Sequence, residues 1–385
     1  MPKYKFAEIV FNITDKKMPE PGDEDLYIGL EHLDSGSLRV TRWGSDVELV
    51  GQKLCMKKGD ILFGRRNTYL RRAAIAPYDG IFSAHGMIFR PNTNVMDPDF
   101  FPFFISSDYF MDAAIRISVG SLSPTVNWKT LKELEFYLPD LEQQRKTSEI
   151  LAAANETKEA YQDLLAKTDE LVKSQFIELF GDPIKNDKKW PTYRFGDVAT
   201  SRLGKMLDKK KQTGLYPKCY LANVNVQWFR FDLDSLNQMD FDEDDQIEFS
   251  LKDGDLLVCE GGEVGRCAIW HEELKDCYFQ KAIHRVRCNK TMVLPEYIAH
   301  LFYYHSQING FADVVGSKAT IAHLPGDKLK EMRIFVPPIT LQNDFINLTK
   351  QTDKSKFVAY QETIFIEKIL KYTYNHTFRR KNNVH

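Results

Sequence analysis

The sequence contains six cysteines but no pair spaced Cys-x-x-Cys. Zinc ribbons and dithiol redox sites require such pairs, so the sequence favours free thiols in a reducing compartment and no metal cluster. It also lacks an uninterrupted apolar run of about 18 residues, the length that a membrane-spanning helix needs. The opening segment, Met1–Phe6, lacks the apolar core of a signal peptide. We therefore expect a cytoplasmic protein without a membrane span.

Sequence motifs of common catalytic sites are also missing. Gly261–Arg266 is rich in glycine but lacks the lysine and hydroxyl of a phosphate-binding loop. Neither a Gly-x-Ser-x-Gly elbow nor a His-Glu-x-x-His zinc motif occurs. The Glu-x-Lys triplets at 156–158 and 273–275 are of a kind that arises often by chance. The sequence therefore predicts a protein that is not itself an enzyme.

An excess of positive charge is absent as well, because the formal net charge is −2. A chain that coats nucleic acid without regard to sequence usually carries a clear basic excess. Any nucleic-acid surface on this chain must therefore be local, which leaves room for a specific reader with acidic faces elsewhere.

What the sequence does contain is a set of three markers that occurs twice in the same order. The glutamines that close the two sets are about 198 residues apart, a far longer period than the roughly 20–50 residues of a solenoid repeat. Each set has a Gly-Asp pair that opens a strand, then a Gly-Ser pair in a loop, and then an apolar-proline segment that enters a helix. The markers are Gly59-Asp60, Gly120-Ser121 and Leu138–Gln144 in the first set, and Gly254-Asp255, Gly316-Ser317 and Val336–Gln342 in the second. This duplication predicts two copies of one mixed α/β domain.

Each copy is followed by a long segment without proline or glycine, 142–180 and 339–374. Both segments are rich in good helix formers, and their apolar residues follow the 4-3 spacing of a coiled-coil seam. The predicted seam residues are Ile150, Tyr161, Leu164 and Leu171 in the first helix, and Phe345, Leu348, Ile366 and Ile369 in the second. Because each helix leaves its domain at an equivalent point, we expect the two to pack antiparallel. Packing of each helix on its own domain, or on another chain, is the alternative.

The predicted fold is therefore α+β, with two similar globular domains, two long helices in an antiparallel coiled coil, and a pseudo-two-fold relation. The predicted boundaries are 1–139 for the first domain, 140–181 for the central helix, 182–337 for the second domain, 338–375 for the distal helix, and 376–385 for a disordered tail.

The order and duplication of these markers resemble the specificity subunit of type I restriction–modification systems. The junction Leu179–Pro183, followed by Trp190, also resembles that family. The resemblance covers the chain from about Phe6 to Tyr374. Two departures are that Gly64 is followed by Arg65-Arg66 where the family commonly has an Arg/Ser-Gly pair, and that Asp140 stands where a second proline is usual.

The resemblance implies that each globular domain is a target-recognition domain that reads one half of a bipartite, asymmetric site in double-stranded DNA. The helices would set the spacer between the halves and dock two modification (methyltransferase) subunits. Restriction (motor-nuclease) subunits would be further partners. This chain would bind no cofactor, and S-adenosylmethionine, ATP and Mg would belong to the partner subunits.

Candidate DNA-binding residues in the first domain are cationic, hydroxyl or aromatic side chains near the markers. Arginine suits guanine edges and phosphates, and asparagine can read adenine. A charged, solvated loop is the alternative explanation of the arginines. The candidates are Arg65, Arg66, Asn67, Tyr69, Arg71, Arg72, His85, Ser121 and Ser123.

The second domain has a corresponding set. For its early lysines, phosphate contact and simple solvation are both open, and the hydroxyl residues of both Gly-Ser loops could instead cap a helix. The two histidines, one in each domain, could face a DNA groove or be buried inside the fold. The candidates are Lys205, Lys209, Lys210, Lys211, Lys281, His284, Arg285, Ser317 and Lys318.

The leading interpretation is a non-catalytic reader of DNA sequence. A self-contained DNA methyltransferase or endonuclease is a second hypothesis, and it predicts methyl transfer or cleavage by the isolated chain. A coiled-coil scaffold that binds only protein is a third, and it predicts unchanged mobility of cognate DNA in the presence of the whole assembly.

Overall fold

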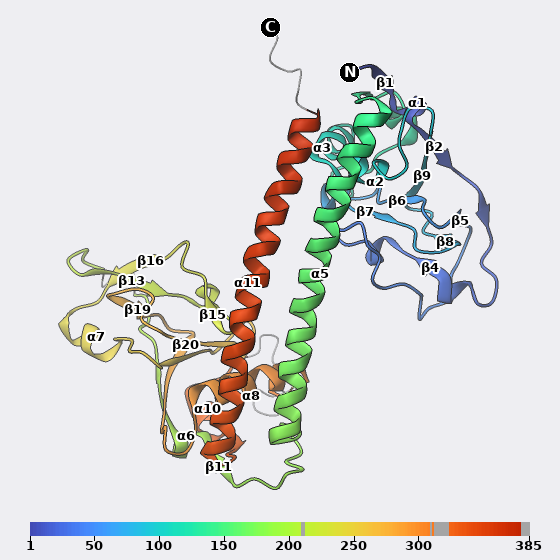
Figure 1. The fold of residues 1–385 in the computed structure, drawn as a ribbon. Helices are drawn as coiled ribbons and strands as arrows, with labels where there is room; N and C mark the ends of the chain where they lie inside the picture. Colours follow the sequence, from blue (N-terminus) through green and yellow to red (C-terminus); the bar gives the residue numbers. More distant parts are fainter. Residues whose placement is uncertain (209–211, 309, 312–322, 379–385) are drawn as a thin grey trace. The chain divides into compact units, whose positions relative to one another are not determined.

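The computed structural model describes residues 1–208, 212–308, 310–311 and 323–378 (Figure 1). The chain forms two compact units. Unit 1 comprises Met1–Asp163 together with the chain from Ala359 onward, and unit 2 comprises Leu164–Val358. The unit boundaries fall inside the two long helices, α5 (Leu141–Phe180) and α11 (Ile339–Phe378), so each unit contains part of both.

Unit 1 is built from two four-stranded sheets and a layer of helices. One sheet has the order β2-β9-β6-β7 and the other β3-β5-β8-β4, and β1 pairs with β10. The strands are β1 (Lys3–Lys5), β2 (Val10–Ile13), β3 (Lys16–Lys17), β4 (Tyr27–Ile28), β5 (Lys53–Met56), β6 (Ile61–Phe63), β7 (Ala73–Ile75), β8 (Gly80–Phe82), β9 (Met87–Pro91) and β10 (Glu135–Tyr137). The helices are α1 (Phe6–Ile9), α2 (Phe101–Ser106), α3 (Asp108–Arg116) and α4 (Trp128–Leu131), with 3-10 turns η1 (Asp23–Leu26), η2 (Leu30–His32) and η3 (Thr68–Leu70).

Unit 2 repeats this plan. Its main sheet has the order β12-β20-β17-β18, its second sheet the order β16-β13-β19, and β11 pairs with β21. The strands are β11 (Thr192–Arg194), β12 (Ala199–Leu203), β13 (Pro217–Leu221), β14 (Val226–Gln227), β15 (Arg230–Phe231), β16 (Asn237–Asp240), β17 (Leu256–Cys259), β18 (Cys267–Ile269), β19 (Cys277–Phe279), β20 (Ile283–Cys288) and β21 (Arg333–Phe335). The helices are α6 (Phe195–Val198), α7 (Glu243–Glu248), α8 (Pro295–Gln307) and α10 (Gly326–Glu331), with the 3-10 turn η5 (Asn223–Asn225).

Strand alternation divides each unit into two cores. In β6, Ile61 and Phe63 face the core shared with the helices, whereas Leu62 faces the core between the sheets. In β17, Leu256 and Val258 face the core shared with the helices, and Leu257 faces the core between the sheets. The main sheet of each unit is therefore buried on both faces, which explains why these strands are almost entirely apolar.

The repeated Gly-Asp marker is a buried ion-pair site. Gly59 and Gly254 turn the chain with φ of 88° and 83°, values that favour glycine. The aspartate that follows is 2% exposed in both units and accepts two hydrogen bonds from an arginine of the neighbouring strand. These bonds measure 2.8 and 2.9 Å for Asp60 with Arg90, and 2.6 and 2.9 Å for Asp255 with Arg287. The marker therefore joins two strands of the main sheet.

The repeated glutamine ties each long helix to its unit. The Gln144 side chain accepts from the backbone N–H of Asp97 (2.8 Å) and donates to the carbonyls of Val95 and Pro139 (3.0 and 2.9 Å). In unit 2, Gln342 accepts from Leu294 (2.9 Å) and donates to Met292 and Pro337 (3.0 and 2.8 Å). Both glutamines are 0% exposed, so these bonds form away from water.

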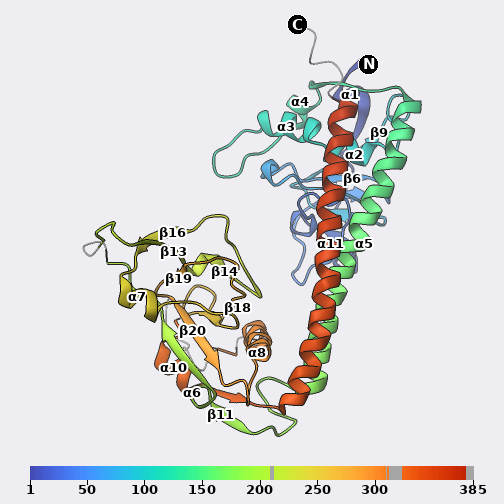
Figure 2. The ribbon, with the colours of Figure 1, turned by 60° about the vertical axis from the view of Figure 1, so that its left-hand side comes forward.

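The two long helices pair antiparallel within each unit (Figures 1 and 2). In unit 1, Leu151 of α5 shares a core with Ile366 and Leu370 near the end of α11. In unit 2, Phe176 and Phe180 near the end of α5 each lie 5.4 Å, centroid to centroid, from Phe345 near the start of α11. The predicted fold class, two similar α/β units with two long antiparallel helices, is confirmed.

The predicted seam of α5 is wrong at three positions. Ile150, Leu164 and Leu171 are 56%, 46% and 47% exposed, because the helix buries the adjacent stripe one residue further along. The buried residues Leu151, Lys158 and Val172 each follow a position of the predicted 4-3 pattern by one residue, and Thr168 is buried on the same side of the helix. Both stripes repeat every seven residues, so spacing alone does not decide between them.

The remaining predicted seam residues lie at or beside the packed face. Phe345 and Ile366 are buried, whereas Tyr161, Leu348 and Ile369 are half-buried. Thr363, which is half-buried, continues the seam of α11 where Glu362 is exposed. α11 also extends to Phe378, so the prediction of a disordered tail from residue 376 is wrong for 376–378, and 379–385 lie outside the described residues.

The sequence also led to expectations about cysteines, metal sites and membrane spans. The six cysteines all lie in strands and are free thiols, and Cys259, Cys267 and Cys277 are buried. Within the residues that the structure describes, no cluster of side chains could hold a metal ion. None of the described helices is both long enough and apolar enough to cross a membrane.

Candidate nucleic-acid interface

The arginine loop of unit 1, residues 64–72, joins β6 to β7. The loop closes where the Gly64 N–H donates to the Arg72 carbonyl over 2.9 Å. A side chain at Gly64 would approach the Arg72 Cβ within 3.1 Å, which accounts for the glycine. Asn67 and Arg71 flank η3 with φ of 55° and 50°, so the loop reverses direction twice within a few residues.

A second segment, the glycine–serine loop (residues 119–125), lies directly against the arginine loop. Arg66 and Thr125 form an antiparallel bridge, and the Asn67 N–H donates to the Pro124 carbonyl over 2.7 Å. The Arg66 guanidinium donates to the Ser123 hydroxyl over 3.4 Å. The fold thus brings together two segments that the sequence predicted separately as DNA contacts.

The charges of the arginine loop are not equivalent. Arg71 forms ion pairs with Asp108 and Asp112 of α3, at 2.8 Å for Asp108, so it anchors the loop to the unit. Arg65, Arg66 and Arg72 form no ion pair with any residue that the structure describes. Arg66 is exposed, and Arg65 and Arg72 are half-buried, so their positive charge is at least partly accessible from solvent.

Other predicted residues of unit 1 lie around the same end of the main sheet. Tyr69 is 56% exposed, His85 is exposed just before β9, and Ser121 is exposed at the tip of the glycine–serine loop. His85 belongs to this end because Met87, at the start of β9, pairs with Phe63 at the end of β6. The Asn67 Oδ1 atom is buried and has no hydrogen-bond partner among the described residues.

Unit 2 has a segment after β17 that corresponds to the arginine loop but differs in chemistry. The segment after β17 meets the chain near His323 through a Gly261–His323 bridge, and the Leu324 N–H donates to the Glu260 carbonyl over 2.6 Å. The positions of Arg65 and Arg66 are thus taken by Glu260 and Gly261. The predicted residues Ser317 and Lys318 lie outside the described residues, as do Lys209, Lys210 and Lys211.

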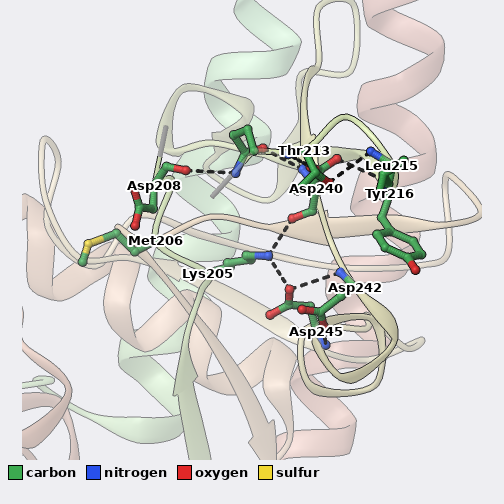
Figure 3. Close-up of a pocket in the computed structure, with 10 residues that line it drawn as sticks. Lys205, Met206, Asp208, Thr213, Leu215, Tyr216, Asp240, Asp242 and Asp245 are labelled. Carbon is green, nitrogen blue, oxygen red and sulfur yellow. Dashed lines mark hydrogen bonds and ion pairs between the residues drawn. The ribbon is translucent and has the colours of Figure 1, made fainter. Parts of the chain in front are cut away.

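The Lys205 side chain contacts other residues of unit 2 (Figure 3). Its ammonium donates to the Asp240 carbonyl over 2.6 Å, forms an ion pair with Asp245, and lies 5.1 Å from the Phe241 ring centroid. Burial opposes ionisation of the Asp240 carboxyl, but bonds from Thr213 and the backbone N–H groups that follow it outweigh burial and lower its pKa. Four aspartates are among the ten residues that line the surrounding cavity of about 450 Å³, and the contacts with Asp240 and Asp245 hold Lys205 in place rather than presenting it to a phosphate.

The remaining candidates of unit 2 lie around β20. Lys281 is exposed, whereas His284 is 1% exposed and bonds the Leu324 carbonyl at 2.9 Å through Nε2. Burial lowers the pKa of His284, which keeps its ring neutral. The sequence left open whether His284 faces a DNA groove or is buried inside the fold, and the structure has it buried.

Arg285 lies in a cavity of about 320 Å³ that also contacts Arg202 and Arg287. The sequence prediction did not include these two arginines. The alternation of arginines in Ile283–Cys288 was the available signal, because residues two apart in a strand share a face.

Known proteins resemble this chain in sequence and in fold. A family model described as the type I restriction modification DNA specificity domain matches residues 27–167. The chain is 22% identical over 364 residues to a protein of Methanocaldococcus jannaschii named as the specificity subunit of the type I restriction enzyme MjaX, which covers 89% of this chain and 83% of that protein. It is 28% identical over 196 residues to a Haemophilus influenzae protein named as a type I restriction enzyme specificity subunit. This match covers 49% of the chain and 42% of the relative, so the chain spans less than half the length of that relative.

Two solved structures have a similar fold along nearly the whole chain. The S subunit of a type I restriction–modification system from M. genitalium has a TM-score of 0.58 at 13% identity, over 97% of this chain and 95% of that one. A chain from a study of complex assembly and conformational transition of the type I R-M system has a TM-score of 0.54 at 16% identity, over 98% and 97% of the two chains. At these identities the likeness concerns the fold.

Proposed function

We propose that this chain is a specificity subunit of a type I restriction–modification system, to which it is similar in sequence and fold, and that each of its two units reads one half of a bipartite DNA site. A duplicated unit whose copies differ in their loops suits an asymmetric site, since each copy can recognise a different base sequence. In dimeric readers, the distance between the reading elements sets the spacing of the half-sites. Here one chain supplies both elements.

The observation that carries the proposal is the meeting of the arginine loop with the glycine–serine loop in unit 1. Arg65 and Arg66 present charge without a carboxylate partner in the described chain, beside exposed hydroxyl and aromatic groups. Guanidinium groups bind guanine edges and phosphates in pairs of hydrogen bonds. Because the net charge is −2, such a local surface is the form that DNA binding would take in this chain.

The proposed partners are two modification subunits, with restriction subunits as further partners. Exposed apolar side chains on both long helices support a protein-binding role for them, because large apolar patches on the surface of a soluble protein commonly mark interaction sites. These residues are Ile150, Leu164, Leu171 and Ile177 on α5, and Phe357, Val358, Tyr360 and Phe365 on α11. In this proposal, the chain is non-catalytic and the partners hold S-adenosylmethionine, ATP and Mg.

Methylation profiling tests the bipartite reading directly. A host that lacks other adenine methylation would express this chain together with its modification subunit. We expect methylation at a split motif, with two short defined sequences separated by a fixed number of unspecified bases. Methylation at a single continuous motif would contradict two-unit reading.

Charge reversal tests the arginine loop. Arg65→Glu with Arg66→Glu should reduce the affinity of the assembly for its cognate duplex by about a hundredfold or more, since two attractive contacts with phosphates or bases become repulsive. The matched control is Lys57→Glu with Lys58→Glu, which reverses two adjacent exposed cations at the opposite end of β6. Footprinting with both variants measures the effect, and equal losses would reject the loop as a specific contact surface.

A further inference from the structure

The duplicated fold provides an internal comparison at one position of the main sheet. In unit 1, Ile13 of β2 lies opposite Ile88 of β9, and Ile88 lies opposite Leu62 of β6. In unit 2, the same register places Arg202 of β12 opposite Arg285 of β20. Arg285 lies opposite Leu257 of β17. A pair of isoleucines in one unit is therefore a pair of arginines in the other.

Two arginines directly opposite each other in adjacent strands destabilise a sheet, because their like charges repel. Burial and the neighbouring Arg287 and Arg202 together lower the pKa of Arg285. Unit 1 shows that an apolar pair suits this position of the fold. The arginine pair is thus a cost to the stability of unit 2, and this suggests that a ligand offsets it.

The two arginines and Arg287 surround a cavity of about 320 Å³, which we call the arginine pocket; it is lined by Thr200, Ser201, Arg202, Ile247, Glu248, Arg285 and Arg287. Contacts within unit 2 fix the arginine side chains of this pocket. The Arg285 Nη1 donates to the carbonyls of Glu248 (2.9 Å) and Ser250 (2.6 Å), and the guanidinium lies 5.4 Å from the Phe279 ring centroid. The Arg202 guanidinium lies 5.6 Å from the Phe249 ring centroid. Arg285 is therefore held in position by two carbonyls and a ring, and Arg202 by a ring and by an ion pair with Glu248.

The charges of the pocket do not cancel. Asp255 neutralises Arg287, and Glu248 pairs with Arg202. Arg285 forms no ion pair with any residue that the structure describes, and only its Nη1 bonds to such residues. Its Nε and Nη2 donors remain for an acceptor, and the hydroxyls of Thr200 and Ser201 line the same space.

We propose that the arginine pocket of unit 2 binds a phosphate group, and that, given the proposed function, this group is a backbone phosphate of the DNA half-site bound by unit 2. A planar guanidinium with two free donors matches two phosphate oxygens. The pocket also supplies unit 2 with positive charge that its loop after β17 does not offer, since Glu260 and Gly261 replace the arginine pair of unit 1 there and Arg266 pairs with Glu263. The two units therefore hold DNA at different places on the same fold.

The test replaces the arginine pair by the pair that unit 1 contains, Arg202→Ile with Arg285→Ile. The assembly with its modification subunits is titrated against cognate and scrambled duplexes over a range of salt concentrations. We expect about tenfold weaker binding of both duplexes and a salt slope, log K against log salt concentration, that is smaller by about one. Arg285→Gln, which keeps a polar side chain, should change binding in the same direction if the isoleucine variant does not fold.

The matched control, Lys328→Ile with Arg333→Ile, removes two exposed cations elsewhere in unit 2 and should leave the salt slope unchanged. A salt slope that is unchanged in the pocket variants would overturn the proposal, and so would an altered sequence preference, since that would mean base reading. Inorganic phosphate at constant ionic strength tests the other source of this group. If phosphate raises the melting temperature of the wild type only, while the salt slopes agree, the ligand is free phosphate and the DNA assignment is wrong. A wild-type assembly that binds no DNA would overturn the proposed function itself.

Discussion

Gln144 and Gln342 are buried amides that each make three hydrogen bonds to backbone groups at the base of a long helix. Asp60 and Asp255 are buried carboxylates that each bind an arginine of the next strand. At the scale of single residues, the two units have the same buried glutamine and aspartate at equivalent positions, with the same kinds of hydrogen bonds. They differ at the Ile13–Ile88 and Arg202–Arg285 pairs, where Ile88 is buried and Ile13 half-buried, whereas Arg285 is half-buried and Arg202 exposed.

Gln144→Ala should lower the free energy of unfolding of unit 1 by about 2 kcal/mol, because three buried backbone groups lose their partner. Gln143, the preceding residue, is exposed, so Gln143→Ala should change it by less than about 0.5 kcal/mol. Chemical denaturation followed by circular dichroism measures both. Equal effects of the two substitutions would mean that the buried hydrogen bonds do not stabilise the helix junction.

The recurrence of these glutamines and aspartates could be read from the sequence, because a duplicated marker is visible in the order of residues alone. Their roles could not be read, since the partners of Gln144 include Val95 and Asp97 in a loop far away in sequence. The same limit applies to the arginine loop. Its sequence shows four similar arginines, and only the fold separates Arg71, which α3 neutralises, from Arg65 and Arg66.

At the scale of elements, the long helices combine a firm seam with an apolar outer face. Their existence and antiparallel pairing followed from length, composition and 4-3 spacing. The sequence did not reveal which stripe α5 buries. The packed face contains Thr147, Ser148 and Lys158, which are polar residues of the kind usually found at the surface. Part of this face packs against unit 1 itself, where small and polar side chains fit close to the globular body.

Two adjacent residues of α5 test which stripe is packed. Leu151→Ala should cost about 2–4 kcal/mol of unfolding free energy, because the side chain is 1% exposed and shares a core with Ile366. Ile150→Ala should cost less than about 0.5 kcal/mol, since that side chain is 56% exposed. Thermal or urea unfolding of the isolated chain distinguishes them, and a larger loss for Ile150 would restore the original sequence prediction.

The helix α8 makes unit 2 sensitive to acid. The His300 ring packs against Phe229 and Phe345, and burial, with a smaller contribution from Lys356, lowers its pKa from 6.5 to about 3. Between these two values, the unfolded chain binds a proton that the folded chain does not, so stability is complete above pH 6.5 and falls as the pH decreases. His305 and His284 have lowered pKa values for the same main reason, burial.

The expected loss from His300 is roughly 1 kcal/mol per pH unit below 6.5. His300→Phe should flatten the dependence, because phenylalanine cannot bind a proton. Urea midpoints of both proteins at pH 7 and pH 5 provide the comparison. The explanation fails if the two midpoints shift by the same amount.

At the scale of the whole molecule, the proposed function makes the helical length a determinant of the DNA site. Insertion of seven residues after Leu164 and seven after Phe357 keeps the seam in register, because the coiled-coil repeat is about seven residues. Each inserted segment adds about 10 Å of helix. We expect the unspecified spacer of the methylated motif to grow by up to about three base pairs, with both half-sites unchanged, as measured by methylation profiling. A changed half-site would show that the helices take part in base reading.

The division of the chain also has a consequence for biosynthesis. Unit 2 is a continuous stretch, Leu164–Val358, whereas unit 1 needs Ile366 and Leu370 of α11 to complete the core around Leu151. A ribosome therefore synthesises all of unit 2 before it makes the piece that finishes unit 1. The segment translated first must wait for the segment translated last, and an unfinished apolar surface is exposed to chaperones and proteases during that interval.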